Sequence, residues 1–176
     1  MKADLEYIET ARLRLEPITT AHAAELFAGL SDRRLYRYYA GVPPASVDEL
    51  ARQYAQLSSQ RSPDGKQIWL NWAMRDRGGD VVGRLQATIV GRTAIIGYDV
   101  FVPFWRRGFA KEGAAAMLES VSKRFGVRRA EAIVDTENVA SIALLRSLGF
   151  RCAWTGPSDD MAGRMDHRYE RRLSGT

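Results

Sequence analysis

The hydrophobic period of the sequence changes once, after residue 100, and this change constrains the fold class. Residues 67–100 hold three stretches rich in β-branched and aromatic residues, separated by the turn sequences "DRGG" and "GR". Such a pattern predicts three strands in an antiparallel meander. From Ala110 to Phe125 the apolar residues recur at steps of three and four, which predicts a helix packed on one side and ended by Gly126. The chain must therefore pack a sheet against helices.

The segment before the meander predicts one strand and two helices. Residues 10–17, "TARLRLEP", alternate apolar and charged side chains as a half-buried strand does. Thr19 or Thr20 is placed to cap a short helix after this strand. Ser46, with Glu49 three residues later, forms a capping box that predicts the start of a second helix.

The segment after the long helix adds a strand, a helix and two strands. The strand is "RRAEAIVD", and Asn138 is placed to cap a helix that Gly149 ends. The two last strands lie near "FRCAW" and "MDHRYERRL". We expect one α/β (α+β) domain over residues 1–176, with a mixed, mainly antiparallel sheet of about seven strands flanked by about four helices.

Composition narrows the class of protein. The 176 residues suit one domain, and the net charge of +5 favours anionic partners without selecting nucleic acid. The single cysteine, Cys152, excludes an internal disulfide and a cysteine metal cluster, and we interpret it as a buried thiol. Residues 1–30 lack an apolar signal core and no run is long enough to span a bilayer, so we expect a cytoplasmic protein. His22 is expected on an exposed helix face.

The stretch "WRRGFAKEG", residues 105–113, joins the predicted meander to the long helix. The first amide groups of a helix lack intrahelical partners and the helix dipole adds positive charge there, so this position attracts anions. Gly108 permits close approach to the backbone, and Arg106 and Arg107 add charge. By itself such a stretch is more often a structural turn. Neither the G-x-G-x-x-G nor the P-loop pattern occurs in the sequence.

Longer segments resemble a known family. "IGYDVFVPFWRRGFAKEGAAAMLESV" followed by "RRAEAIVDTENVASIALLRSLGF" resembles the GNAT superfamily of acetyl-CoA-dependent N-acetyltransferases. With the opening "TARLRLEPITTAHAAELF", the chain looks most like the branch of the ribosomal-protein-alanine N-acetyltransferases, RimJ and RimL. The resemblance implies a GNAT-like fold. It also implies transfer of an acetyl group from acetyl-CoA to a primary amine, by direct attack in a ternary complex.

The same resemblance implies where acetyl-CoA binds. The strand near Val100 and Phe101 would pair with the pantetheine arm, and Asn138 would hydrogen-bond that arm. The turn before the central helix would cradle the pyrophosphate through six residues, Arg106, Arg107, Gly108, Phe109, Ala110 and Lys111.

The catalytic roles implied by the family include one departure. Many GNAT enzymes have a tyrosine four residues before the final glycine of the signature, and Leu145 occupies that place here. In the RimJ and RimL branch a serine three residues after the asparagine is the proposed substitute, which is Ser141. Ser141 is equally interpretable as a helix residue that satisfies a backbone donor. A backbone N–H near Val100 is the implied donor to the thioester carbonyl. The base is not assigned, and its candidates are Asp159, Asp160, Asp166, His167 and Glu170.

The acceptor and two other classes of function stay open. Tyr36, Tyr38 and Tyr39, in the Arg- and Tyr-rich segment 32–44, are expected at the acceptor mouth, with core or lid packing as the alternative. The amine would belong to a protein N-terminus or a small molecule, without a membrane partner, and a homodimer stays open. Because Leu145 replaces the family tyrosine, a second possible function is a module that binds acyl-CoA without turnover. A third, less favoured function is nucleic-acid binding, which the net charge alone suggests. No residue spacing indicates a metal site.

Overall fold

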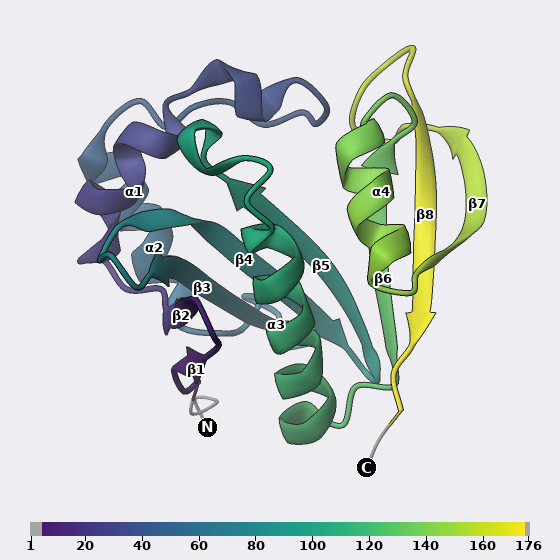
Figure 1. The fold of residues 1–176 in the computed structure, drawn as a ribbon, viewed down its shortest axis with the longest axis horizontal. Helices are drawn as coiled ribbons and strands as arrows, with labels where there is room; N and C mark the ends of the chain where they lie inside the picture. The colour runs from purple at the N-terminus through teal and green to yellow at the C-terminus, as the bar shows by residue number, and fades with distance from the viewer. Residues whose placement is uncertain (1–4, 175–176) are drawn as a thin grey trace.

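One sheet organises the chain, and its strand order is β1-β2-β3-β4-β5-β6-β8-β7. The computed structural model describes residues 5–174 (Figure 1). Neighbouring strands are antiparallel except β5 and β6, which run parallel. The strands are β1 (Ile8–Glu9), β2 (Leu13–Pro17), β3 (Ile68–Asp76), β4 (Val81–Val90), β5 (Thr93–Val100), β6 (Arg129–Asp135), β7 (Arg151–Pro157) and β8 (Met165–Arg172).

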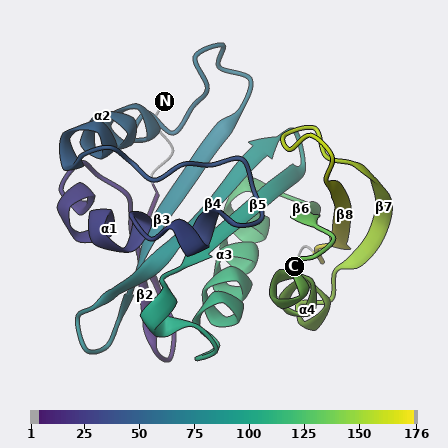
Figure 2. The ribbon, with the colours of Figure 1, turned by 90° about the horizontal axis from the view of Figure 1, so that it is seen from above.

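Helices cover both faces of the sheet (Figure 2). Helices α1 and α2 pack on one face with Ala73 and Phe101, whereas α3 packs on the other with Leu85 and Met74. Within residues 5–174 no helix is long and apolar enough to cross a membrane. The helices are α1 (His22–Leu30), α2 (Val47–Leu57), α3 (Phe109–Phe125) and α4 (Val139–Ser147), with short 3-10 helices η1 (Arg33–Tyr36) and η2 (Val102–Phe104).

The predicted fold class is confirmed: a mixed, mainly antiparallel sheet flanked by four α-helices. The sheet has eight strands in place of about seven, because the two-residue β1 adds to the edge by pairing Ile8 with Leu15. So short a strand leaves no alternating pattern to read in the sequence.

The helix-start signals were partly confirmed. Ser46 Oγ accepts the Glu49 N–H at 3.1 Å, and Asn138 Oδ1 accepts the Ser141 N–H at 3.1 Å, as capping residues do. The prediction that Thr19 or its neighbour caps α1 is wrong. The N-cap is Ala21, and no side chain among the described residues caps this helix.

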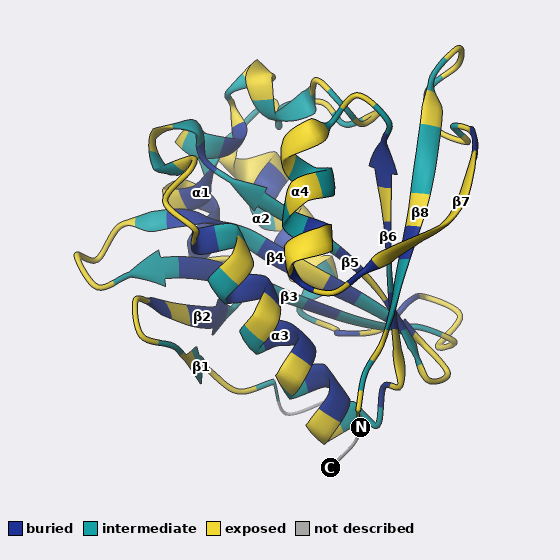
Figure 3. Cartoon of the chain, turned by 45° about the vertical axis from the view of Figure 1, so that its right-hand side comes forward, coloured by how far each residue is buried: buried dark blue, intermediate teal, exposed yellow. Residues whose placement is uncertain are grey.

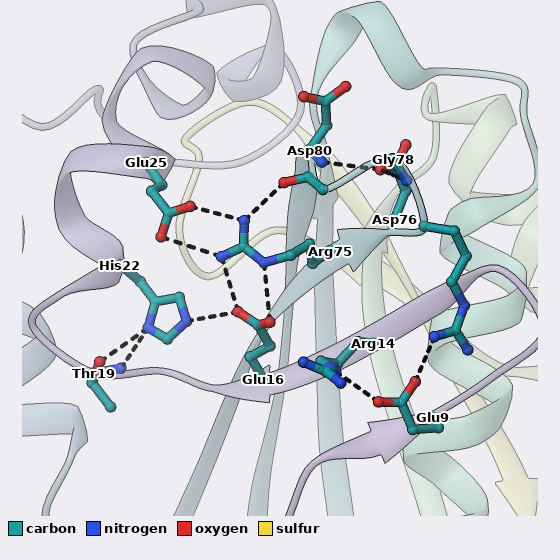
Figure 4. Close-up of polar contacts among 12 residues, drawn as sticks. Glu9, Arg14, Glu16, Thr19, His22, Glu25, Arg75, Asp76, Gly78 and Asp80 are labelled. Carbon is teal, nitrogen blue, oxygen red and sulfur yellow. Dashed lines mark hydrogen bonds and ion pairs between the residues drawn. The ribbon is translucent and has the colours of Figure 1, made fainter.

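A buried polar network fastens α1 to the sheet (Figure 4). His22 is only 9% exposed, so the expectation of an exposed histidine is wrong. Its Nδ1 accepts the Thr19 N–H at 3.1 Å and therefore holds no proton, so Nε2–H donates to Glu16 at 3.1 Å. Arg75 then bridges Glu16 of β2 and Glu25 of α1 through its guanidinium nitrogens.

The interpretation of Cys152 as a buried thiol is also wrong. Cys152 is exposed. It lies on β7, the last strand of the sheet, where residues 151–155 are all exposed (Figure 3). Its Sγ lies 3.7 Å from Nδ1 of His167 on the neighbouring strand β8.

Removing Arg75 should destabilise the fold more at neutral pH than in acid. Burial alone would raise the pKa of Glu16, but hydrogen bonds from Arg75 and His22 hold it below its ordinary value. The stability from this lowered pKa is fully present above the ordinary glutamate pKa, and it is lost as the pH falls through the lowered value. We expect Arg75→Ala to cost about 3 kcal/mol at pH 7, because it leaves Glu16 buried without its cation.

Urea unfolding at pH 7 and at pH 3 measures this difference. Arg14→Ala is the control, since Arg14 pairs with Glu9 on the exposed edge and should leave the unfolding midpoint nearly unchanged. An Arg75→Ala variant with the same loss at both pH values would contradict the ionic origin of the effect.

Candidate functional site

The two strands at the centre of the molecule separate, and the candidate site lies in the gap. β5 pairs with β6 only from Thr93 to Ile95, opposite residues 129–131. Beyond this point β5 stays paired with β4 up to Val100, and β6 stays paired with β8 up to Asp135. The strands therefore diverge (Figure 1), and a cleft of about 320 Å³ lies between them.

The diverging part of β5 presents an unpaired backbone edge to the cleft. The Phe101 N–H donates to the Val82 carbonyl of β4 at 2.8 Å. Because backbone groups point alternately to the two sides of a strand, the amides of Tyr98 and Val100 point away from β4, toward the gap. Phe101 has its amide occupied and its side chain buried with α1 and α2. Of the two strand residues implied to meet the pantetheine arm, Val100 has the available N–H, whereas its carbonyl accepts the Trp105 indole N–H.

The cleft opens onto both faces of the sheet, and side chains alternate between them. Tyr98 points to the face covered by α3 and α4, where Asn138 and Ser141 also line the cleft. Asp99 points to the face of α1 and α2, where it pairs with Arg84. We call these the α4 side and the α1 side of the cleft.

A pair of hydroxyl groups lies on the α4 side. Tyr98 Oη and Ser141 Oγ are 2.6 Å apart. Burial raises the pKa of Tyr98 to about 12, although the hydrogen bond to Ser141 opposes this shift. Ser141 gives its own N–H to the Asn138 cap, and its hydroxyl contacts Tyr98. The hydroxyl therefore makes no capping bond, and Leu145 one turn later is fully buried.

Tyr98 is a residue that sequence reasoning missed. The alternation along "TAIIGYDV" was enough to place it on the same side as Ile96. Its contact with Ser141 requires β5 and α4 to lie on either side of one gap, and no local sequence signal specifies that neighbourhood.

The α1 side contains an ion pair beneath two tyrosines. Arg84 Nε donates to Asp99 at 2.8 Å, and the Tyr39 hydroxyl lies 3.4 Å from the same carboxylate. Burial raises the pKa of Tyr39 above its ordinary value, so this phenol stays protonated. Tyr38 and Tyr39 line the cleft. Tyr36 lies behind them, with its ring 5.3 Å from that of Tyr39 and its hydroxyl bonded to the Leu30 carbonyl.

The second carboxylate of the cleft lies at the end of β6. Asp135 is 2% exposed, and it accepts hydrogen bonds from Arg164 Nε at 2.6 Å and from the Glu137 N–H at 2.8 Å. Burial would raise the pKa of Asp135, but these bonds hold it below its ordinary value. Among the described residues, Asp99 and Asp135 are the carboxylates that line the cleft. The candidates from the sequence lie outside it: Asp159, Asp160, Asp166, His167 and Glu170.

The turn before α3 has the backbone and the charge of an anion site. Arg106 and Gly108 have positive φ angles of 62° and 81°. Gly108 is the N-cap of α3, and no side chain within residues 5–174 caps that end. Arg106, Arg107, Gly108 and Lys111 are exposed, Ala110 is half-buried and Phe109 is buried. Trp105 Nε1 donates to the Val100 carbonyl at 2.5 Å, which joins the turn to the edge of β5.

Comparison with known proteins identifies the family. The family model of the acetyltransferase (GNAT) domain matches residues 12–151. The chain belongs to the GNAT acetyltransferase family. Transfer of an acetyl group from acetyl-CoA is the general function of that family, and the chain is an acetyltransferase.

Relatives agree with this assignment. An uncharacterized N-acetyltransferase, YoaA of Bacillus subtilis (strain 168), is 28% identical over 151 residues, which cover 82% of each chain. Another, p20 of Bacillus licheniformis, is 28% identical over 150 residues, 84% of this chain and 83% of that one.

Solved structures share the fold. RimL, the ribosomal L7/L12 α-N-protein acetyltransferase solved with coenzyme A, superimposes with a TM-score of 0.83 at 17% identity, covering 97% of this chain and 100% of that one. A GCN5-related N-acetyltransferase from Brucella melitensis gives a TM-score of 0.79 at 22% identity, covering 98% and 80%. In the described part of this chain, no group of three or more His, Cys, Asp or Glu side chains could hold a metal ion.

Proposed function

We propose that acetyl-CoA binds on the α4 side of the cleft, and that a primary amine reaches its thioester from the α1 side. The gap between β5 and β6 is the observation that supports this arrangement, because it connects the two faces through one opening. Both reactants are then held together in a ternary complex, and direct attack needs no covalent enzyme intermediate.

The residues of this chain fit coenzyme A. The N–H groups of Tyr98 and Val100 that face the gap suit an extended arm with amide groups, and Asn138 lines the same cleft as Tyr98. The pyrophosphate would lie on the turn that follows, where backbone amides and exposed cations meet. Its cradle comprises the six residues expected from the sequence, Arg106, Arg107, Gly108, Phe109, Ala110 and Lys111.

Acetyl transfer needs three further contributions. The thioester oxygen gains negative charge during attack, and the amide of Tyr98 or Val100 at the edge of β5 is its donor. The neutral amine loses one proton to solvent as its bond to the acetyl carbon forms, and the sulfur gains one as the C–S bond breaks; solvent then returns a proton to the group that protonated the sulfur. Ser141 is the donor to the sulfur, and Tyr98 directs it by donating to Ser141 Oγ, which leaves the Ser141 proton free to point into the cleft.

The Tyr98–Ser141 hydroxyl pair favours a catalytically active enzyme rather than a module that only binds acyl-CoA. Leu145 removes the family tyrosine from α4, but Tyr98 supplies a phenol from β5. The assay is release of free coenzyme A thiol with acetyl-CoA and a panel of amines. The solved RimL proteins modify ribosomal protein L7/L12, so peptide N-termini belong in the panel beside polyamines, amino acids and aminoglycosides. Binding of acetyl-CoA without thiol release from any amine would favour the binding module.

Nucleic acid is the weaker alternative partner. The phosphates of coenzyme A would explain the basic turn, and Arg84 and Arg164 on the α1 side are paired with Asp99 and Asp135. Affinity for a nucleic acid that falls steeply with salt would support that alternative.

The first prediction concerns the pyrophosphate. Gly108→Val places a β-branched residue at a φ of 81°, with its Cβ 3.2 Å from Arg12 Nη2. We expect it to weaken coenzyme A binding by about 1–3 kcal/mol, through lost backbone hydrogen bonds to a charged group. Calorimetry gives the affinity. Gly126→Val is the matched control, because Gly126 has a φ of 66° at the other end of α3. It should cost stability and leave the affinity unchanged, and an equal affinity loss in both variants would contradict the placement.

The second prediction concerns the hydroxyl pair. We expect Ser141→Ala to lower kcat by roughly 10–100-fold and Tyr98→Phe by about tenfold, with little change in affinity for acetyl-CoA. Because Tyr98 acts through Ser141, its removal should add nothing in the Ser141→Ala background. Steady-state kinetics of the two single variants and the double variant measure this.

Tyr169→Phe is the control for the pair, because the Tyr169 hydroxyl is buried without a hydrogen-bond partner in residues 5–174. It should retain normal turnover. A Ser141→Ala variant with normal kcat and a lower melting temperature would show that Ser141 is a structural helix residue.

The third prediction concerns the acceptor. Replacing Tyr38 and Tyr39 together by Ala should raise the KM for the amine several-fold and leave acetyl-CoA affinity nearly unchanged, since both side chains line the cleft on the α1 side. Tyr36→Phe, which removes only the bond to the Leu30 carbonyl, should have little effect. If the double variant instead loses acetyl-CoA binding, this segment belongs to the donor side.

A further inference from the structure

Arg12, which no sequence motif singled out, contacts the turn before α3 from the opposite end of the chain. Its Nη1 donates to the Arg107 carbonyl at 2.8 Å. Its Nε donates to Glu112 Oε2 at 2.6 Å, and its backbone N–H donates to Glu112 Oε1 at 2.7 Å. Its guanidinium lies 5.0 Å from the centre of the Phe109 ring. The Arg12 side chain thus joins the residue before β2 to Arg107, just before α3, and to Glu112, in the first turn of α3.

Glu112 explains why a cation is needed here. It lies in the first turn of α3, where its charge suits the helix dipole but would repel a nearby phosphate. Burial opposes its ionisation, yet hydrogen bonds from Thr10 and Arg12 hold the pKa of Glu112 below its ordinary value. The carboxylate therefore stays charged, and Arg12 both neutralises it and is anchored by it.

The remaining nitrogen of Arg12 lies beside the backbone that an anion would approach. A Cβ atom added to Gly108 would lie 3.2 Å from Arg12 Nη2, and this is the nearest atom that it would meet. Within the described residues Nη2 has no hydrogen-bond partner, whereas Nη1 and Nε are both engaged. A guanidinium anchored at two nitrogens, with its third free at the turn, is oriented for a phosphate oxygen.

We propose that Arg12 is a positioning residue for the pyrophosphate of coenzyme A. It holds the Arg107 carbonyl and so fixes the positive-φ turn, it cancels the charge of Glu112, and it turns Nη2 toward the bound phosphates. This inference rests on the proposed binding of acetyl-CoA and adds a role for a residue just before β2, far from the turn in the sequence.

The test compares ligands that differ only in their phosphates. Arg12→Met keeps an aliphatic stem over Phe109 and removes the guanidinium. Arg14→Met is the matched control two residues further along the chain, in β2, where the arginine pairs with exposed Glu9. Calorimetry measures the affinity of each variant for coenzyme A and for dephospho-coenzyme A, and NMR titration measures it for pantetheine.

We expect Arg12→Met to bind coenzyme A and dephospho-coenzyme A each about tenfold more weakly, because both contain the pyrophosphate. Its affinity for pantetheine, which has no phosphate, should equal that of the wild type, and Arg14→Met should match the wild type for all three. A structural defect alone would weaken all three ligands alike. Equal losses across the three, or an unchanged affinity for coenzyme A, would overturn the proposal.

A second variant tests the proposal in case Arg12→Met does not fold. Arg12→Lys keeps a cation beside Glu112 but cannot reach the Arg107 carbonyl and Glu112 at once, so a smaller loss with the same ligand pattern is expected. If Arg12→Lys instead binds pantetheine as weakly as it binds the two phosphate-containing ligands, the proposed role of Arg12 is overturned here as well. Wild-type protein that fails to bind coenzyme A would reject the proposed donor site, whereas normal binding by wild type and Arg12→Met rejects Arg12 alone.

Discussion

The short ladder between β5 and β6 determines where the cleft lies in this protein. Each strand is paired along its outer side, β5 with β4 and β6 with β8, whereas the ladder between β5 and β6 is limited to residues 93–95 and 129–131. A continued ladder would satisfy the amides of Tyr98 and Val100 and close the cleft. Its early end leaves backbone groups that need other partners, and an extended ligand in the gap can supply them.

Charge separates the two sides of that opening. On the α1 side the two cleft carboxylates are matched by arginines, Asp99 by Arg84 and Asp135 by Arg164. At the turn before α3 three exposed cations have no carboxylate within ion-pairing distance in residues 5–174: Arg106, Arg107 and Lys111. The excess positive charge of the chain is thus available where phosphates would bind, and it favours one orientation of coenzyme A in the cleft.

Local signals predicted most of the fold, and long-range contacts explain what they missed. Ser46, Asn138 and Gly126 act at helix ends through neighbours within a few residues, so their roles were readable. His22 was misplaced because its burial depends on Glu16 and Arg75, brought together from two strands. Cys152 looked like a core residue in an apolar stretch, but only the strand order shows that β7 is an edge. The cleft carboxylates Asp99 and Asp135 were missed because the cleft depends on where β5 and β6 diverge, and no local sequence pattern specifies that point.

The hydroxyl pair connects the shape of the cleft to the proposed proton transfer. Had the phenol been on α4, where Leu145 stands, its distance from Ser141 would be fixed within one helix. Tyr98 instead reaches from β5, so its 2.6 Å contact with Ser141 spans the two diverging halves of the sheet. Widening of the gap would lengthen this hydrogen bond and release the Ser141 hydroxyl from its orientation. In the proposed complex the gap would have to admit the pantetheine arm without separating β5 from α4, so the short ladder that joins the two strands would serve the proposed proton transfer as well as the fold.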